Sequence, residues 1–192
     1  MPCPEKFKES LVCFHVAPSI SERILDGCGD LVSSSPKKQK AAFFARAVAI
    51  LDECLEWEDK CGLMEYNACC KGGLRAAVVK KFASDNSGLS LAEKIAALAD
   101  IPNMGRPCLH ADGTIFARIE YLIEGKFHCP CPNFHRLKMT ERVSTTYCLC
   151  CAGHFKHHYQ KALGIRLETK EIVSSPLESG GERPCVIAFK QI

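Results

Sequence analysis

The chain has 192 residues, of which 47% are hydrophobic and 24% are charged, and its formal net charge at pH 7 is +3. This composition is typical of a globular protein and excludes a disordered or collagen-like chain. A nucleic-acid-binding protein usually has a strongly basic face, and a membrane-spanning helix needs about 18 uncharged apolar residues; the sequence has neither feature. We therefore expect no nucleic acid and no membrane among the partners of this protein.

Cysteine is the unusual part of the composition. The chain has 14 Cys, a content that indicates disulfides, metal binding or thiol chemistry. The first residues, Met1 to Lys6, contain no apolar secretion signal, so we expect a cytoplasmic protein with reduced thiols. Neighbours such as Cys69 and Cys70 also rarely bond each other without strain. Metal binding and a reactive thiol remain, beside the plainer alternative that a reducing, anaerobic cytosol tolerates many cysteines.

The apolar pattern of residues 1–110 predicts a mostly helical N-terminal part. A short helix is expected at Ser21–Leu25. Apolar residues at three-and-four spacing then predict a long helix that begins at Pro36 and ends near Gly62.

A second helical region runs from about Leu63 to Ala83. Gly72-Gly73 interrupts it, because each glycine costs a helix about 1 kcal/mol relative to Ala, and we expect a break there. Ser90 and Glu93 form a capping-box sequence that opens a third helix, which stops near Asp100.

Residues 111–192 form a Cys-rich part with the spacing of β-strands. The expected strands cover residues 114–123, 126–129, 142–146, 166–173 and 184–190. The turn Glu124-Gly125 joins the first two, and Tyr147–Leu163 is a helix that Gly164 ends. This β-β-β-α-β-β order after the helices predicts an α+β fold, in which N-terminal helices pack with an antiparallel sheet as one compact domain.

The densest group of candidate metal ligands lies in the expected helix that begins at Tyr147. On a helix, Cys150 and Cys151 lie four and three residues before His154, so each shares a face with it, and Cys and His are zinc ligands. The plainer alternative is that either thiol packs in the core as a small hydrophobe. His157 and His158 are expected to face water.

Two Cys-x-Cys sequences, Cys129/Cys131 and Cys148/Cys150, together supply four thiols that suit a zinc site. An iron–sulfur cluster uses the same ligands, but its usual Cys-x-x-Cys-x-x-Cys spacing is absent, so we rank iron below zinc. Cys148 lies at the expected helix start, where the helix dipole lowers a thiol pKa.

A third candidate is the segment Cys69-Cys70-Lys71-Gly72-Gly73, whose glycines permit a close approach of backbone or ligand. The alternative is a core cysteine beside a helix break. The scattered cysteines are interpreted as structural: Cys3, Cys13, Cys28, Cys54, Cys61 and Cys108.

The last 45 or so residues resemble the carboxy-terminal pattern of the 4-vinyl-reductase domain family. The resemblance rests on Cys148–Gly153, Leu163-Gly164, Glu171 and the strand Gly181–Phe189. A similar ending occurs in bacterial proteins described as L-2-amino-thiazoline-4-carboxylate hydrolase-like. The resemblance implies a small-molecule-binding α+β fold, in some members sensory, with a structural zinc held by Cys and Glu.

Carried over to this chain, the resemblance places metal ligands at Cys148, Cys150 or Cys151, Glu171 and Cys185. A further family cysteine, three residues after the Glu, corresponds to Ser174. The missing ligand is then supplied by Cys129, Cys131 or His154, or the metal has been lost and an apolar pocket with thiols on its wall remains.

Our leading hypothesis is a cytosolic binding protein in which six thiols gather near the start of the Tyr147 helix: Cys129, Cys131, Cys148, Cys150, Cys151 and Cys185. Some of them hold zinc in a structural or sensory site, and the adjoining pocket takes a small molecule. A homodimer is a further candidate assembly. The alternative is a thiol-dependent hydrolase, with Cys148 or Cys150 as nucleophile and His154 as base.

Overall fold

The computed structural model describes residues 2–69, 71–137 and 141–192, and confirms the α+β class with helices preceding an antiparallel sheet. The N-terminal helices are α1 (Pro4–Cys13), α2 (Pro18–Leu25), α3 (Lys37–Cys54), α4 (Trp57–Tyr66), α5 (Gly73–Asp85) and α6 (Leu91–Ala99). The later helical elements are the 3-10 turn η1 (Thr145–Cys148), α7 (Leu149–Leu163) and the short α8 (Pro176–Ser179). None of the helices in these described ranges is long and apolar enough to cross a bilayer.

Four antiparallel strands form the main sheet in the spatial order β1-β2-β6-β5. They are β1 (Cys108–Leu109), β2 (Ile115–Ile119), β5 (Leu167–Ser174) and β6 (Cys185–Gln191). A separate hairpin, β3 (Leu122–Ile123) with β4 (Lys126–Phe127), turns at Glu124 and Gly125, which both have positive φ. The predicted two-residue turn is therefore confirmed.

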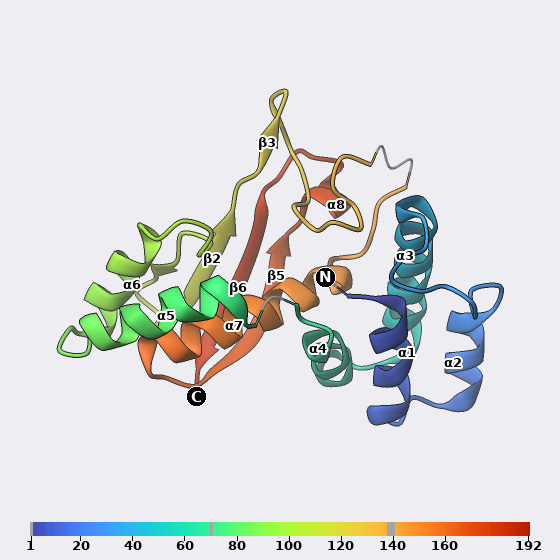
Figure 1. Ribbon diagram of the computed structural model, residues 1–192, viewed down its shortest axis with the longest axis horizontal. Helices are drawn as coiled ribbons and strands as arrows, with labels where there is room; N and C mark the ends of the chain where they lie inside the picture. The colour runs from blue at the N-terminus through green and yellow to red at the C-terminus, as the bar shows by residue number, and fades with distance from the viewer. Residues whose placement is uncertain (1, 70, 138–140) are drawn as a thin grey trace.

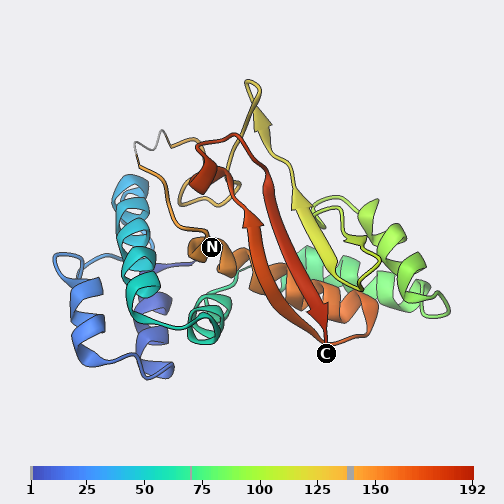
Figure 2. The same cartoon turned by 180° about the vertical axis from the view of Figure 1, so that it is seen from behind.

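Helix α7 lies between the sheet and the other helices. Figure 1 shows α5 in front of α7 with the strands behind it, and Figure 2 shows the strands from the opposite side, in front of α7. Helices α4 and α5 both pack against α7. Because α7 is covered on more than one side, its buried residues occur all around it rather than in one stripe.

The N-terminal helices pack around a group of phenylalanine rings. Phe7 of α1 contacts Phe43 and Phe44 of α3 edge-on, with ring centroids 5.7 and 5.5 Å apart. Phe44 also lies 5.8 Å from Tyr147 of η1. Tyr147 thus joins this aromatic core to the segment that starts α7.

Several predicted boundaries are confirmed. Ser90 and Glu93 form the complete capping box of α6, and Gly164 ends α7 in the left-handed conformation with φ 73°. The helical region after residue 63 breaks as expected, since α4 ends at Tyr66 and α5 begins at Gly73. Helix α1 and strand β1 are additions that the sequence pattern did not indicate.

The predicted end of the long helix at Gly62 is wrong. Helix α3 ends at Cys54, and Leu55 is extended before α4 begins at Trp57. Gly62 lies inside α4, where a Cβ atom would come within 2.8 Å of the ring of Phe14. The glycine permits a close side-chain approach instead of stopping a helix.

The predicted strand at residues 142–146 is also wrong, so the expected β-β-β-α-β-β order does not hold in detail. The Ser144 hydroxyl accepts a hydrogen bond from the Thr146 backbone N–H at 3.1 Å and starts the 3-10 turn. The Thr146 hydroxyl in turn donates to Asp52 of α3 at 2.6 Å. A long-range contact therefore determines a conformation that the β-branched residues did not predict.

Helices α4 and α7 approach each other closely at Gly153 of α7. A Cβ atom at Gly153 would lie 2.8 Å from Cα and 2.9 Å from the carbonyl oxygen of Glu65 in α4. The Glu65 carboxylate pairs with Lys156 of α7 and accepts a hydrogen bond from Thr169 of β5. Glu65 consequently links α4, α7 and the sheet.

We predict that Gly153→Ala destabilises the protein by about 1–3 kcal/mol, because backbone atoms of α4 would have to move away from the added methyl group. Urea unfolding followed by circular dichroism measures this loss. Gly88→Ala is the matched control, since a Cβ atom at Gly88 meets nothing within 4 Å. Equal stability of the two variants would contradict the proposed importance of the α4–α7 contact.

Candidate functional site

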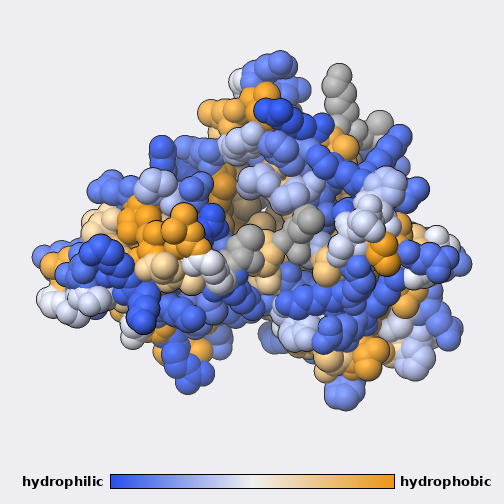
Figure 3. Space-filling model, in the orientation of Figure 1, coloured by the Kyte–Doolittle hydropathy of each residue, from blue (hydrophilic) through white to orange (hydrophobic). Residues whose placement is uncertain are grey.

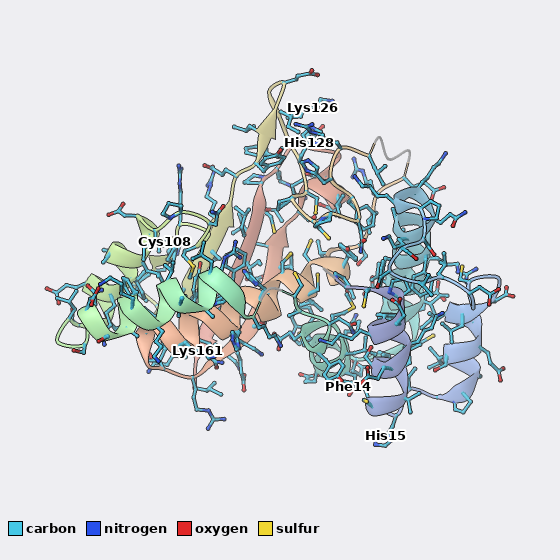
Figure 4. All side chains as sticks on the ribbon, viewed as in Figure 1. Phe14, His15, Cys108, Lys126, His128 and Lys161 are labelled. Carbon is cyan, nitrogen blue, oxygen red and sulfur yellow. The ribbon has the colours of Figure 1, made fainter. Side chains whose placement is uncertain are left out.

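A cavity of about 240 Å³ lies where the loop after β4, the start of α7, the start of β6 and the beginning of α5 meet. Cysteines from four segments line it: Cys69, Cys129, Cys131, Cys148, Cys150, Cys151 and Cys185. Figure 4 shows sulfur atoms gathered between the loop after β4 and the start of α7, with the labelled Cys108 apart from them. In Figure 3 the surface is hollowed near its centre. The six predicted thiols thus share one cavity.

A larger hollow of about 670 Å³ lies between residues 27–31 and α3. Its lining includes one cysteine, Cys28, whose sulfur lies 3.6 Å from the Arg46 guanidinium. We base the functional site on the smaller cavity, because seven cysteines of the described chain line it.

The Cys129/Cys131 pair follows the β3–β4 hairpin. Both side chains are buried, and a hydrogen bond between them favours a thiolate on Cys131 and a protonated Cys129. This bond is the largest cause that lowers the pKa of Cys131 to about 6, and burial opposes it. Burial adds to the raised pKa of Cys129. The pair therefore holds one proton near neutral pH.

Tyr147 and Asn133 complete the surroundings of Cys131. The Tyr147 hydroxyl lies 3.0 Å from the Cys131 sulfur and accepts a hydrogen bond from the Asn133 side-chain amide at 3.1 Å. The Tyr147 hydroxyl therefore donates its proton in a hydrogen bond to the Cys131 sulfur, which stabilises the thiolate. The Asn133 backbone N–H stabilises the thiolate in the same way. The Asn133 amide also donates to the carbonyl of Pro2 at 2.9 Å.

A second pair joins α7 to the sheet. Cys148 precedes α7, and Cys185 is the first residue of β6, opposite Ile119 of β2. The hydrogen bond between their sulfurs lowers the pKa of Cys148 and raises that of Cys185, while burial raises both. The Ser175 hydroxyl, 3.2 Å from the Cys148 sulfur, contributes to the lowered pKa.

The third pair, Cys150 and Cys151, lies in the first turn of α7. A hydrogen bond with Cys151 and burial both raise the pKa of Cys150 well above its ordinary value. Cys150 is buried and Cys151 is partly exposed. The Cys150 thiol is therefore protonated at neutral pH.

His154 also lines the cavity, and its ring contacts α5 and the segment before it. Its Nδ1 lies 2.9 Å from the carbonyl oxygen of Cys69, and its Nε2 contacts the guanidinium of Arg75. The carbonyl accepts a hydrogen bond from Nδ1–H, so Nε2 must accept one from the guanidinium, which fixes a neutral ring. Burial, with smaller effects from Arg75 and His158, lowers the pKa of His154 to about 4, although the Cys69 hydrogen bond opposes this.

This arrangement does not support the Cys–His pair expected for a hydrolase. Both ring nitrogens of His154 are occupied, by Cys69 and by Arg75. A base with a pKa of about 4 also accepts a proton poorly at neutral pH. If a thiol in this cavity acts as a nucleophile, its thiolate is preformed by the thiol pairs.

Glu171, expected as a ligand from the family resemblance, is exposed on β5 and does not line the cavity. A register irregularity between Thr169 and Glu171 explains this position. Strand alternation from Leu167 and Thr169, which are buried, would turn Glu171 inward, and a bulge reverses that alternation.

The expectation that His158 faces water is wrong, because its side chain is fully buried. His158 is four residues from His154, and their rings are 4.7 Å apart on the covered side of α7. His157 is partly exposed. Among the cysteines interpreted as structural, Cys13 and Cys108 are exposed and the other four are partly buried.

Within residues 2–69, 71–137 and 141–192, no group of three or more His, Cys, Asp or Glu side chains is already close enough together to hold a metal ion. The sulfurs are instead arranged in pairs around the cavity. The candidate Cys70 lies outside the described residues.

Sequence reasoning did not identify Arg75 or Tyr147 as members of the site. The Gly72-Gly73 break was a usable signal for Arg75, because it starts a helix that approaches the cavity. No family model, curated protein or solved structure gives a significant match to this chain.

The lowered pKa of His154 predicts acid sensitivity. Between pH 6.5 and 4 the unfolded chain binds a proton at this residue that the folded protein resists, so the contribution to stability is complete above pH 6.5 and declines toward pH 4. The decline amounts to about 3 kcal/mol. Urea unfolding across this range, in a chelating buffer, should show a shallower pH dependence for His154→Gln.

The control for this prediction is His15→Asn. His15 is exposed and has a φ of 51°, a backbone conformation that Asn tolerates. If the control and His154→Gln give the same pH dependence as the unmodified protein, burial of a neutral His154 is not the cause of acid sensitivity.

Proposed function

We propose that this protein binds a zinc ion through cavity thiolates, in a structural or sensory site beside a small-molecule pocket. The observation that carries the proposal is the convergence of paired thiols from separate segments on one cavity. Thiolate sulfur is a preferred zinc ligand, and a site closed by four protein ligands has no open position for water.

The ligands we propose are the two pairs Cys129/Cys131 and Cys148/Cys185. Each pair contains one thiol whose pKa is lowered and one whose pKa is raised by its partner. The pairs also interact with each other, since Cys148 raises the pKa of Cys129 and Cys129 that of Cys185. The lowered pKa of one thiol in each pair favours the thiolate form, whose negative charge complements a divalent cation.

Pairing also fits the geometry of a zinc–thiolate site. With zinc–sulfur bonds of about 2.3 Å, neighbouring sulfurs of a tetrahedron are about 3.8 Å apart, similar to two hydrogen-bonded thiols. Each pair would supply one edge of such a tetrahedron, and binding requires the two pairs to approach each other. The resulting metal affinity would contribute directly to folding.

We expect about one zinc per chain in protein that is expressed with zinc and purified without chelator. Cys131→Ser and Cys148→Ser should each reduce this content to less than about 0.2, because a four-thiolate site loses most of its zinc affinity when one ligand is removed. Elemental analysis by mass spectrometry measures the content. Cys13→Ser and Cys108→Ser are matched controls at exposed thiols.

Less than about 0.2 zinc per chain in the unmodified protein would refute the proposed metal site. If the protein instead contains iron with visible absorbance, and the same two variants lose it, the site holds an iron–sulfur cluster and not zinc. Zinc that persists in both variants would exclude these four ligands.

Alkylation by iodoacetamide at pH 7 separates the metal site from the thiol hydrolase. For the metal site we expect the cavity thiols to be protected until a chelator is added, and Cys131 to react first afterwards, because its pKa is about 6. Peptide mass spectrometry identifies the modified cysteine. Rapid alkylation of one cavity cysteine in zinc-replete protein would instead favour the thiol enzyme.

A further inference from the structure

Arg75 is the cationic side chain of the cavity wall. The described residues that line the cavity include no Asp or Glu. No carboxylate of the described chain forms an ion pair with Arg75, whereas other arginines such as Arg23, Arg118 and Arg183 do. Arg75 is partly buried, so its charge is neither fully hydrated nor neutralised by the protein.

The neighbours of Arg75 hold its guanidinium without reducing its charge. One N–H group contacts Nε2 of His154, and His154 is oriented by the Cys69 carbonyl. A guanidinium has five N–H donors in a planar fork, so the contact with a single ring nitrogen leaves most of them for another acceptor.

We propose that the small molecule bound beside the thiols is an oxyanion, a carboxylate or a phosphate, and that Arg75 binds it. A planar guanidinium binds two oxygens of such a group at once, and partial burial strengthens the interaction relative to water. The cavity volume of about 240 Å³ restricts the ligand to a small molecule. This inference names the ligand class for the pocket of the proposed function and rests on that pocket, but its tests do not require zinc.

The first test compares two alkylating reagents of similar size, anionic iodoacetate and neutral iodoacetamide. At each cavity cysteine, Arg75 should raise the rate ratio of iodoacetate to iodoacetamide, because it attracts only the anion. We expect Arg75→Gln to lower this ratio by about threefold or more and Arg75→Lys to lower it less. Since both reagents react with the same thiolate, a change in thiol pKa alone leaves the ratio unaltered.

Two exposed cysteines and an arginine outside the cavity serve as controls. Exposed Cys13 and Cys108 should show no change in the ratio on substitution of Arg75. Arg23→Gln on α2 removes an exposed arginine that does not line the cavity, and should leave the cavity ratio unchanged. An unchanged cavity ratio in both Arg75 variants would overturn the proposal.

A second test applies where the cavity thiols do not react. Acetate and inorganic phosphate, each compared with chloride at equal ionic strength, should raise the melting temperature of the purified protein by about 2 °C at concentrations well above the dissociation constant. Arg75→Lys should reduce this rise and Arg75→Gln should abolish it. Stabilisation by acetate alone identifies a carboxylate site, and by phosphate alone a phosphate site.

No stabilisation of the unmodified protein by either anion, or an equal rise in Arg75→Gln, would overturn the proposal. Zinc analysis of the same samples keeps the two proposals distinguishable. If the protein binds the anion but contains no zinc, only the proposed metal site is refuted. If Arg75→Gln retains zinc but no longer binds the anion, the result supports both the metal site and the anion site.

Discussion

The close packing of α4 against α7 is the contact on which the thiol-lined cavity depends. Gly153 allows the backbone of Glu65 to approach α7, and the Glu65 carboxylate also contacts Lys156 and Thr169. This contact lies just after the first turn of α7, where Cys150 and Cys151 are placed. With α7 fixed between the helices and the sheet, the start of β6 and the loop after β4 can present their sulfurs to the same space.

The cavity combines two kinds of chemistry. One comes from thiol pairs in which the pKa of one thiol is lowered and that of its partner is raised. The other comes from Arg75 and a neutral His154. Soft-metal binding and oxyanion binding therefore use different groups, so each can be removed by substitution without direct loss of the other.

Local sequence signals predicted those parts of the fold that depend on a few neighbouring residues. The Ser90–Glu93 capping box, Gly164 and the Glu124-Gly125 turn are of this kind. The errors occurred where a distant contact determines the backbone. Thr146 binds Asp52 and forms a 3-10 turn instead of a strand, and Gly62 accommodates the ring of Phe14 inside a helix.

The site was predictable to a similar extent. Cysteines that lie close together in the sequence were the signal for the site. They indicated that Cys129 and Cys131 meet the cysteines at the start of α7. Glu171 was assigned from the family resemblance, and the irregularity in β5 that leaves it exposed cannot be read from the sequence. For Arg75 the Gly72-Gly73 break was the available local signal, but the break does not show that α5 packs against α7, on which the position of Arg75 depends.

The division between enclosed and exposed cysteines has a consequence for handling the protein in air. Cys13, at the end of α1, and Cys108, in β1, are exposed, whereas most of the cavity thiols are buried. Intermolecular disulfide bonds will therefore form first through these two surface positions. Covalent dimers seen on a non-reducing gel would report surface oxidation, and the enclosed sulfurs would remain reduced within them.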